Sequence, residues 1–329
     1  MKEFTNRLAV VTGAGSGMGR ELAVQLAEAG CHLALCDVSW DNLEATQAMC
    51  ARSGSGVKVS IHTCDVADEQ QMLAFRDDAL EQHDTDHAHL LFNNAGIGGG
   101  GSFVEDSRED WERTFNVCWH GVYYGCRAFL PLLVAAEEGH VVNTSSVNGF
   151  WASIGPGIPH TAYSAAKFAV KGFTEALITD LRVNAPHVNV SLVMPGHVGT
   201  SIVENSMRLL RGHDAMEMSA DEVAQTRDRL KARGMPVDNV PDDHIRAAVY
   251  QQAVDFREKA PLTAADAAGI ILDGVRENRW RILVGRDAEQ LDAAVRAAPE
   301  EAYEADFVQR IQEPGFLAGG LEQGVAGET

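Results

Sequence analysis

A glycine-rich turn near the N-terminus most constrains how this chain folds. The apolar run 8–12 leads toward a segment with apolar residues at helical spacing, and between the two stand Gly13, Gly15, Gly17 and Gly19. This pattern predicts a strand, a tight turn and a helix. Glycine tolerates positive φ and leaves no Cβ in the way of a ligand, and a helix N-terminus favours a pyrophosphate. A glycine turn alone, however, does not exclude a loop without a ligand.

The next expected strand, residues 31–37, ends in an acidic side chain. Asp37 lies eighteen residues beyond Gly19. In a dinucleotide-binding βαβ unit, an acid at this place accepts hydrogen bonds from the adenosine ribose hydroxyls. A carboxylate there also repels the 2′-phosphate of NADP, and no Arg or Lys follows immediately in Val38-Ser39-Trp40. NAD is therefore the expected cofactor.

Tyr163 and Lys167 are four residues apart in the Ala-rich run 161–169. Helical spacing places both side chains on one face. Free tyrosine has a pKa of about 10 and is a poor base at neutral pH, but a neighbouring ammonium group favours the phenolate. The pair is therefore a candidate proton-transfer catalyst. The spacing alone also occurs by chance on many amphipathic helices.

Taken together, seven motifs between about Leu8 and Gly285 resemble, in order, those of the short-chain dehydrogenase/reductases. They are Thr12-Gly13-Ala14-Gly15-Ser16-Gly17-Met18-Gly19 for the cofactor turn, Asp65-Val66 for the adenine contact, Asn93-Asn94-Ala95-Gly96 after the fourth strand, Asn116 in a helix, Ser146 after the fifth strand, Tyr163 with Lys167, and Pro195-Gly196-His197-Val198-Gly199-Thr200 beside the nicotinamide. Any single motif is weak, whereas the ordered set is highly specific.

This resemblance implies a role for each matching residue. Tyr163 would be the general base, Lys167 would lower its pKa and bind the nicotinamide ribose, and Ser146 would hydrogen-bond the substrate oxygen. Asn116 would hold a water that links Lys167 to solvent. Ser145 is the rival for the catalytic hydroxyl, although the family's Ser-x-x-Gly run favours Ser146. The implied cofactor-binding residues are Gly13, Ser16, Gly17, Met18, Gly19, Asp37, Asp65, Val66, Asn93, Ala95, Gly96, Tyr163, Lys167, Pro195, Gly196, Val198 and Thr200.

Two segments are expected to surround the substrate. Ser146 and Tyr163 are seventeen residues apart, whereas the family usually separates them by about a dozen, so the loop 148–160 is expected to be an enlarged, substrate-facing loop. Residues 201–260 interrupt the alternation of strands and helices. They are expected to form a lid over an apolar substrate, or else a helical pair against the surface or a neighbouring subunit. The candidate substrate contacts are Trp151, Ile154, His160, His197 and Ile202.

We therefore predict an NAD-dependent oxidoreductase that interconverts a secondary alcohol and a ketone, with an apolar, moderately bulky substrate. Two alternatives stay open. One is a sugar epimerase or dehydratase of the same superfamily, which the glycine spacing disfavours. The other is a nonenzymatic dinucleotide sensor, which would not need the catalytic set Asn116, Ser146, Tyr163 and Lys167.

The periodicity predicts one α/β domain, a Rossmann-type doubly wound parallel sheet over residues 1–298, with 201–260 as a lid insertion and 299–329 as a tail. Strands are expected near 7–12, 31–37, 57–62, 88–92, 139–144, 188–193 and 281–284. Helices are expected near 17–29, 40–52, 68–83, 107–134, 161–184, 263–277 and 287–297. By analogy with the family, the helices near 107–134 and 161–184 would build a homotetramer or homodimer.

Composition excludes several classes of partner. The net charge of −20 argues against nucleic acid and anionic membrane surfaces, and no uninterrupted apolar run approaches the ~20 residues needed to span a bilayer. The six cysteines form no C-x-x-C pair and are expected to be buried, reduced thiols of a cytoplasmic protein. His87 and His89 could be drawn as a metal pair, but no Cys or carboxylate spacing completes a site, so no metal is predicted.

Overall fold

The computed structural model describes all residues except 53–55, 156, 233 and 311–329. Its main sheet has seven parallel strands in the order β3-β2-β1-β4-β5-β6-β9. Their bounds are Leu8–Thr12 (β1), His32–Asp37 (β2), Val59–Thr63 (β3), Leu90–Asn93 (β4), Gly139–Thr144 (β5), Val188–Pro195 (β6) and Arg281–Val284 (β9). Each expected strand is present, and the predicted Rossmann-type doubly wound fold is confirmed.

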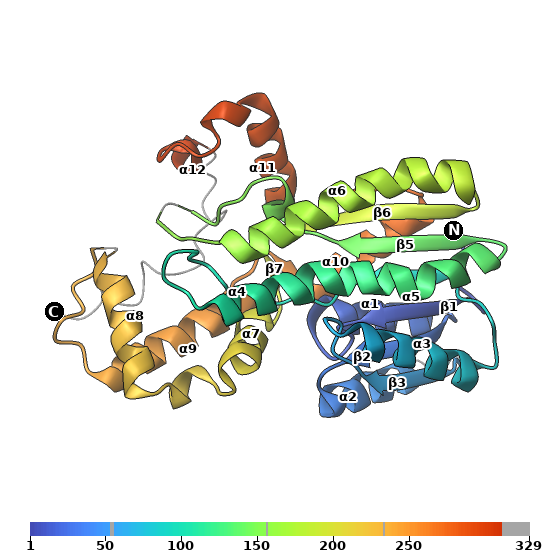
Figure 1. Cartoon of the computed structure of the whole chain (residues 1–329), viewed down its shortest axis with the longest axis horizontal. Helices are drawn as coiled ribbons and strands as arrows, with labels where there is room; N and C mark the ends of the chain where they lie inside the picture. Colours follow the sequence, from blue (N-terminus) through green and yellow to red (C-terminus); the bar gives the residue numbers. More distant parts are fainter. Residues whose placement is uncertain (53–55, 156, 233, 311–329) are drawn as a thin grey trace.

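Helices cover both faces of this sheet (Figure 1). One face carries α1 (Gly17–Glu28), α2 (Trp40–Arg52) and α10 (Ala264–Arg276). The other carries α3 (Glu69–His83), α5 (Gly121–Ala135) and α6 (Thr161–Asn184). The central strands are buried on both faces, which is why they read as continuous apolar runs rather than alternating ones.

The strand order reverses between β1 and β4, so the loops that follow these two strands flank a crevice. The Thr12 hydroxyl accepts hydrogen bonds from the backbone amides of Asn94 (3.0 Å) and Ala95 (3.1 Å). The Asn94 side-chain amide donates back to the Thr12 carbonyl at 3.1 Å. Thr12 thus joins the glycine turn to the loop that follows β4.

The helix expected over 107–134 is interrupted. It consists of α4 (Arg108–Phe115), a π-helical turn (Asn116–His120) and α5. The Gly121 amide donates to the Asn116 carbonyl, five residues back. A Cβ at Gly121 would lie 2.7 Å from the Val66 side chain, so only glycine permits this approach. Side-chain periodicity carries no signal for such a widened turn, which is common at functional sites.

Residues 201–260 contain a helical insertion beyond one end of the sheet, at the lower left of Figure 1. It comprises α7 (Ile202–Arg211), a 3₁₀ turn (Ala215–Glu217), α8 (Ala220–Ala232) and α9 (Asp242–Glu258). At its base, β7 (Val198–Gly199) pairs in parallel with β8 (Leu262–Thr263). The insertion has a small core of its own, made by Met218, Val223, Val237 and Ile245.

Part of the segment expected to be a tail packs on the fold. After α11 (Arg286–Ala297) come a 3₁₀ turn (Pro299–Glu301) and α12 (Phe307–Arg310), seen together at the top of Figure 1. Ala302 and Phe307 are buried in a cluster with Trp151. The rest of the expected tail, residues 311–329, lies outside the described residues.

Among the residues that the structure describes, no helix is long and apolar enough to cross a membrane. In the same part of the chain, His, Cys, Asp and Glu side chains form no group of three that could hold a metal ion.

Candidate active site

The glycine turn after β1 is shaped to receive a phosphate group. Gly13 and Gly17 have φ values of +65° and +52°, in the left-handed region that favours glycine. A Cβ at Gly19 would lie 2.1 Å from the Gly13 carbonyl oxygen, so a side chain there is excluded. Ser16 is the N-cap of α1, and its side chain makes no capping hydrogen bond. The first amides of α1 are therefore not taken up by a cap, and they fit the pyrophosphate of a dinucleotide.

The Asp37 carboxylate is fixed beside this turn. Its two oxygens accept hydrogen bonds from the backbone amides of Gly15 and Ser39, each at 3.0 Å. A Cβ at Gly15 would lie 2.8 Å from the carboxylate. Asp37 is thus held at the carboxyl end of β2, where an acid can receive ribose hydroxyls.

Two other predicted cofactor residues already have protein partners. Asp65 accepts a hydrogen bond from the Ala67 amide and forms an ion pair with Arg113 at 2.7 Å. The buried Asn93 side chain donates to Asn143 Oδ1 at 2.8 Å. Because Arg113 and Asn143 lie far along the chain from their partners, spacing alone could not have indicated these contacts.

Tyr163 and Lys167 occupy the first two turns of α6. The Lys167 ammonium lies 5.4 Å from the centre of the Tyr163 ring and donates to the Thr144 carbonyl at 2.9 Å. Only 2% of Lys167 is exposed, and burial lowers its pKa. Burial also raises the pKa of Tyr163, and a hydrogen bond with the Ser146 side chain opposes this shift. Ser146, Tyr163 and Lys167 thus converge.

The two adjacent serines face different partners. The Ser145 hydroxyl is buried and donates to the Lys167 carbonyl at 2.8 Å, and a Cβ at Gly149 would lie 2.2 Å from it. The Ser146 hydroxyl accepts a hydrogen bond from the Asn148 amide at 3.1 Å and also contacts Tyr163. Ser145 therefore fastens β5 to α6, and this arrangement favours Ser146 as the hydroxyl that meets a substrate.

The predicted Asn116 is held by a neighbour on its own helical turn. Its side-chain oxygen and His120 Nδ1 are 2.9 Å apart. Two residues further on, the Cys118 thiol is fully buried and donates to the Ile97 carbonyl at 3.2 Å. The sequence analysis did not single out Cys118 as a site residue.

The five candidate substrate contacts have different surroundings. Trp151 is 2% exposed and its indole N–H donates to the Ala302 carbonyl at 2.6 Å, so it anchors its loop on the C-terminal segment. His197 Nε2 is 2.7 Å from the Phe256 carbonyl oxygen of α9. The His160 ring lies 4.8 Å from the Tyr163 ring, and burial lowers its pKa to about 4. Ile154 is partly buried in the enlarged loop.

The fifth candidate, Ile202, lines a cavity of about 370 Å³ between the loop after β4 and the insertion. Its walls consist of Gly98, Gly99, Ile202, Val203, Ser206, Met207, Leu210, Arg211, His213, Met218, Glu222, Gln225, Thr226 and Arg229. Two of its arginines already have carboxylate partners: Arg211 pairs with Asp110 at 2.8 Å and Arg229 with Asp106 at 2.7 Å. The remaining wall combines apolar side chains (Ile202, Val203, Met207, Leu210, Met218) with polar ones (Ser206, His213, Glu222, Gln225, Thr226).

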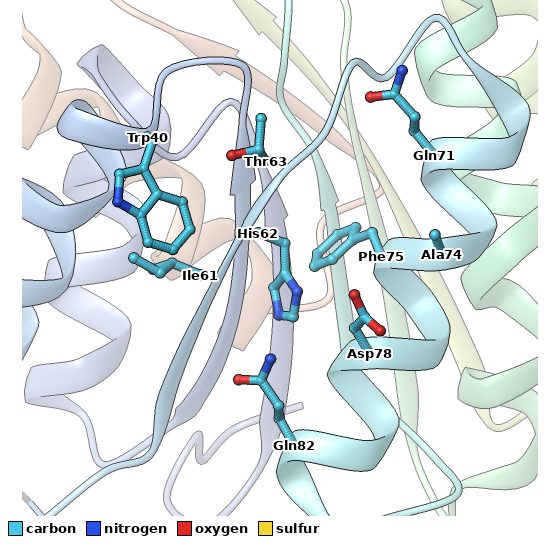
Figure 2. A pocket seen from close by; sticks show the side chains of 9 residues that line it. All are labelled: Trp40, Ile61, His62, Thr63, Gln71, Ala74, Phe75, Asp78 and Gln82. Carbon is cyan, nitrogen blue, oxygen red and sulfur yellow. The ribbon is translucent and has the colours of Figure 1, made fainter.

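A second hollow, of about 290 Å³, follows the outer strand β3 (Figure 2). It is lined by Trp40, Ile61, His62, Thr63, Gln71, Ala74, Phe75, Asp78 and Gln82. Figure 2 shows the His62 ring facing Phe75, and their ring centres are 4.9 Å apart. None of the lining residues belongs to the predicted catalytic or cofactor set.

Comparison with known proteins agrees with this geometry. Residues 7–209 match the family described as short chain dehydrogenase. The chain belongs to that family. This short-chain dehydrogenase is 34% identical over 296 residues to SadH of Mycobacterium tuberculosis, a protein provisionally described as an oxidoreductase, and the match covers 90% of this chain and 92% of SadH.

Two further relatives extend the comparison. Levodione reductase of Leifsonia aquatica is 34% identical over 208 residues, which are 63% of this chain and 75% of that protein. A solved short-chain dehydrogenase/reductase of Burkholderia phymatum, in complex with NAD, is 31% identical, with a TM-score of 0.71 over 95% of this chain and 98% of its own. The short-chain dehydrogenase described here is thus an oxidoreductase of this family, and a nicotinamide dinucleotide is supported as its cofactor.

Proposed function

We propose that this short-chain dehydrogenase interconverts a secondary alcohol and a ketone with NAD. The convergence of Ser146, Tyr163 and Lys167 next to the glycine turn carries the proposal. A phenol, a hydroxyl and a buried ammonium group around one point are suited to moving a proton on and off an alcohol oxygen. The reductase named among its relatives agrees with this chemistry.

In the oxidation direction, each of the three side chains has one task. The Ser146 hydroxyl donates a hydrogen bond to the substrate oxygen and stabilises its developing negative charge. Tyr163 takes the hydroxyl proton, and the Lys167 ammonium favours the phenolate that does so. NAD, when bound, supplies the hydride acceptor, while the protein aligns the reacting groups.

We assign NAD rather than NADP because of Asp37. Its carboxylate is anchored by two backbone amides beside the glycine turn, so it is unable to swing away from the adenosine ribose without losing both hydrogen bonds. A 2′-phosphate at that place would meet a fixed negative charge.

The proposed substrate is apolar and moderately bulky. Five apolar side chains, Ile202, Val203, Met207, Leu210 and Met218, are on the wall of the cavity beneath the insertion. Its two arginines and His213 are each paired with a carboxylate. Each additional methylene buried there should contribute about 0.8 kcal/mol until the cavity is full.

We further propose a homodimer or homotetramer in a reducing, cytoplasmic environment. On α4 the Trp111 and Phe115 rings stack at 5.4 Å. Phe103, in the loop before α4, contacts Trp111 edge-on and is 75% exposed. Such a surface is typical of subunit contacts. All six cysteines are buried free thiols. Sedimentation analysis of the wild type should therefore give a mass of two or four chains.

The function is tested by following the absorbance of reduced nicotinamide with a homologous series of secondary alcohols, with NAD and NADP in parallel. We expect kcat/KM to rise along the series and to be much higher with NAD. Absence of turnover with every alcohol and with the corresponding ketones would favour the dinucleotide sensor. A preference for the smallest alcohol would contradict the proposed substrate cavity, and equal use of both cofactors would contradict the role of Asp37.

A further inference from the structure

On the π-helical turn between α4 and α5, the side chains of Asn116 and Cys118 contact different segments. Asn116 and Cys118 are both on this turn, yet the Asn116 side chain binds His120, within the same turn. The Cys118 side chain instead reaches the loop that follows β4, where its thiol donates to the Ile97 carbonyl. Only the contact made by Cys118 joins the helix to another segment.

The loop that Cys118 reaches lies against the catalytic lysine. A Cβ added at Gly96 would be 3.5 Å from Lys167 Nζ and 3.8 Å from Cys118 Sγ. The ammonium group and the thiol therefore border the same face of one glycine. Both the Cys118 thiol and the Lys167 ammonium group are buried there. Burial raises the pKa of Tyr163 and lowers that of Lys167.

We propose that Cys118 is a positioning residue of the catalytic centre: by holding Gly96 and Ile97 in place, its thiol keeps the Lys167 ammonium beside Tyr163. The thiol satisfies the Ile97 carbonyl, and its sulfur fills the space next to Gly96. Without it, a buried carbonyl loses its donor and a void opens beside the lysine. An ammonium group that gains freedom stabilises the phenolate less, so the pKa of Tyr163 rises.

The experiment compares Cys118→Ala and Cys118→Ser with Cys31→Ala. Cys31 is a matched control because it is equally buried and also donates to a backbone carbonyl, that of Arg7, at 3.2 Å, but it lies at the start of β2, far from the site. The kinetic readout, which rests on the proposed function, is kcat/KM for alcohol oxidation as a function of pH. The second readout is NADH binding, followed by fluorescence, which needs no substrate.

We expect Cys118→Ala to move the rising limb of the pH profile upward by about one unit and to lower kcat at pH 7.5 about tenfold. It should also weaken NADH binding about fivefold, because the loop with Gly96 is loosened. Cys118→Ser retains an O–H donor and should restore both readouts toward wild type. Cys31→Ala should change neither readout.

The inference is overturned if Cys118→Ala matches Cys31→Ala in both readouts. Circular dichroism would detect a failure of Cys118→Ala to fold. In that case Cys118→Ser is the deciding variant, and an upward shift of the rising limb of its pH profile would contradict the donor role of the thiol. If the wild type oxidises no secondary alcohol, the proposed function fails. The role of Cys118 is then tested by NADH binding alone, compared between Cys118→Ala and Cys31→Ala.

Discussion

At the scale of single residues, the site combines two groups whose charged forms burial alone would disfavour. Tyr163 and Lys167 are both moved by desolvation toward their neutral forms. For Tyr163, the hydrogen bond with the Ser146 side chain opposes this shift, and the Lys167 ammonium lies 5.4 Å from the centre of the same ring. The chemistry therefore depends on the relative placement of a few atoms rather than on the residue types alone.

Replacing Tyr163 with Phe tests this at the proton-transferring atom. The ring still packs against His160, so folding and NADH binding should be nearly unchanged, but kcat should fall about 100- to 10,000-fold because no other base is positioned for the proton. Tyr250→Phe, which alters an exposed tyrosine on α9, is the matched control. Retention of more than a tenth of wild-type kcat would contradict the assignment of Tyr163 as the base.

At the scale of elements, α7 connects the insertion to both sides of the crevice. Asn205 donates to the Ser16 hydroxyl at 3.0 Å, on the glycine turn. The Ser206 hydroxyl accepts from the Gly98 amide at 2.8 Å, on the loop after β4. An ion pair between Glu204 and Arg257 fastens α7 to α9. The position of α7 is therefore coupled to the two loops that flank the cofactor site.

Ser206→Ala should consequently loosen α7 over the substrate cavity. Loss of the hydrogen bond with the Gly98 amide costs about 1 kcal/mol, which corresponds to a rise in KM of about fivefold, with little change in kcat. The second bond of this hydroxyl, to the Ile202 carbonyl, lies within α7. Ser60→Ala is the control, because Ser60 is also buried and hydrogen-bonded but lies on β3, where its hydroxyl contacts His62 and His83. Steady-state kinetics on both variants make the comparison. An equal KM for Ser206→Ala and wild type would mean that α7 does not cover the substrate.

At the scale of the whole molecule, several histidines are held neutral by the fold. His140 in β5 is fully buried and hydrogen-bonded to Ser191 at 2.8 Å, and burial lowers its pKa to about 3. Burial likewise lowers the pKa values of His83, His89 and His160 to about 4. As the pH falls, these histidines become protonated in the unfolded chain at a higher pH than in the folded protein. The folded state therefore loses stability before most carboxylates titrate.

The free energy of unfolding should therefore decrease as the pH falls below about 6.5, the ordinary histidine value. His140 alone contributes a slope of about 1.4 kcal/mol per pH unit between its unfolded and folded pKa values. Urea denaturation of wild type and His140→Asn at pH 7.5, 6.0 and 5.0 measures this slope. The variant should be less stable at pH 7.5 but should lose less stability on acidification. Parallel pH dependences would show that His140 does not contribute.

Local sequence determined much of this protein. The glycine turn, the alternation of apolar runs with helical periods, and Tyr163 four residues before Lys167 are short-range patterns. They report backbone conformation and side-chain direction within one element. For this reason the seven strands and the doubly wound sheet could be predicted, and the ordered motifs indicated the family by resemblance. The structure and the comparisons confirm both.

Tertiary structure alone decided which side chains meet. A five-residue hydrogen-bonded turn sends Asn116 toward His120 and Cys118 toward Ile97, and side-chain periodicity does not register that change. The indole N–H of Trp151, a predicted substrate contact, donates to the Ala302 carbonyl, 151 residues away in sequence. Both outcomes depend on contacts between segments that are distant along the chain. The energies of these contacts depend on how the elements pack together in the folded protein, and no local sequence pattern encodes that packing.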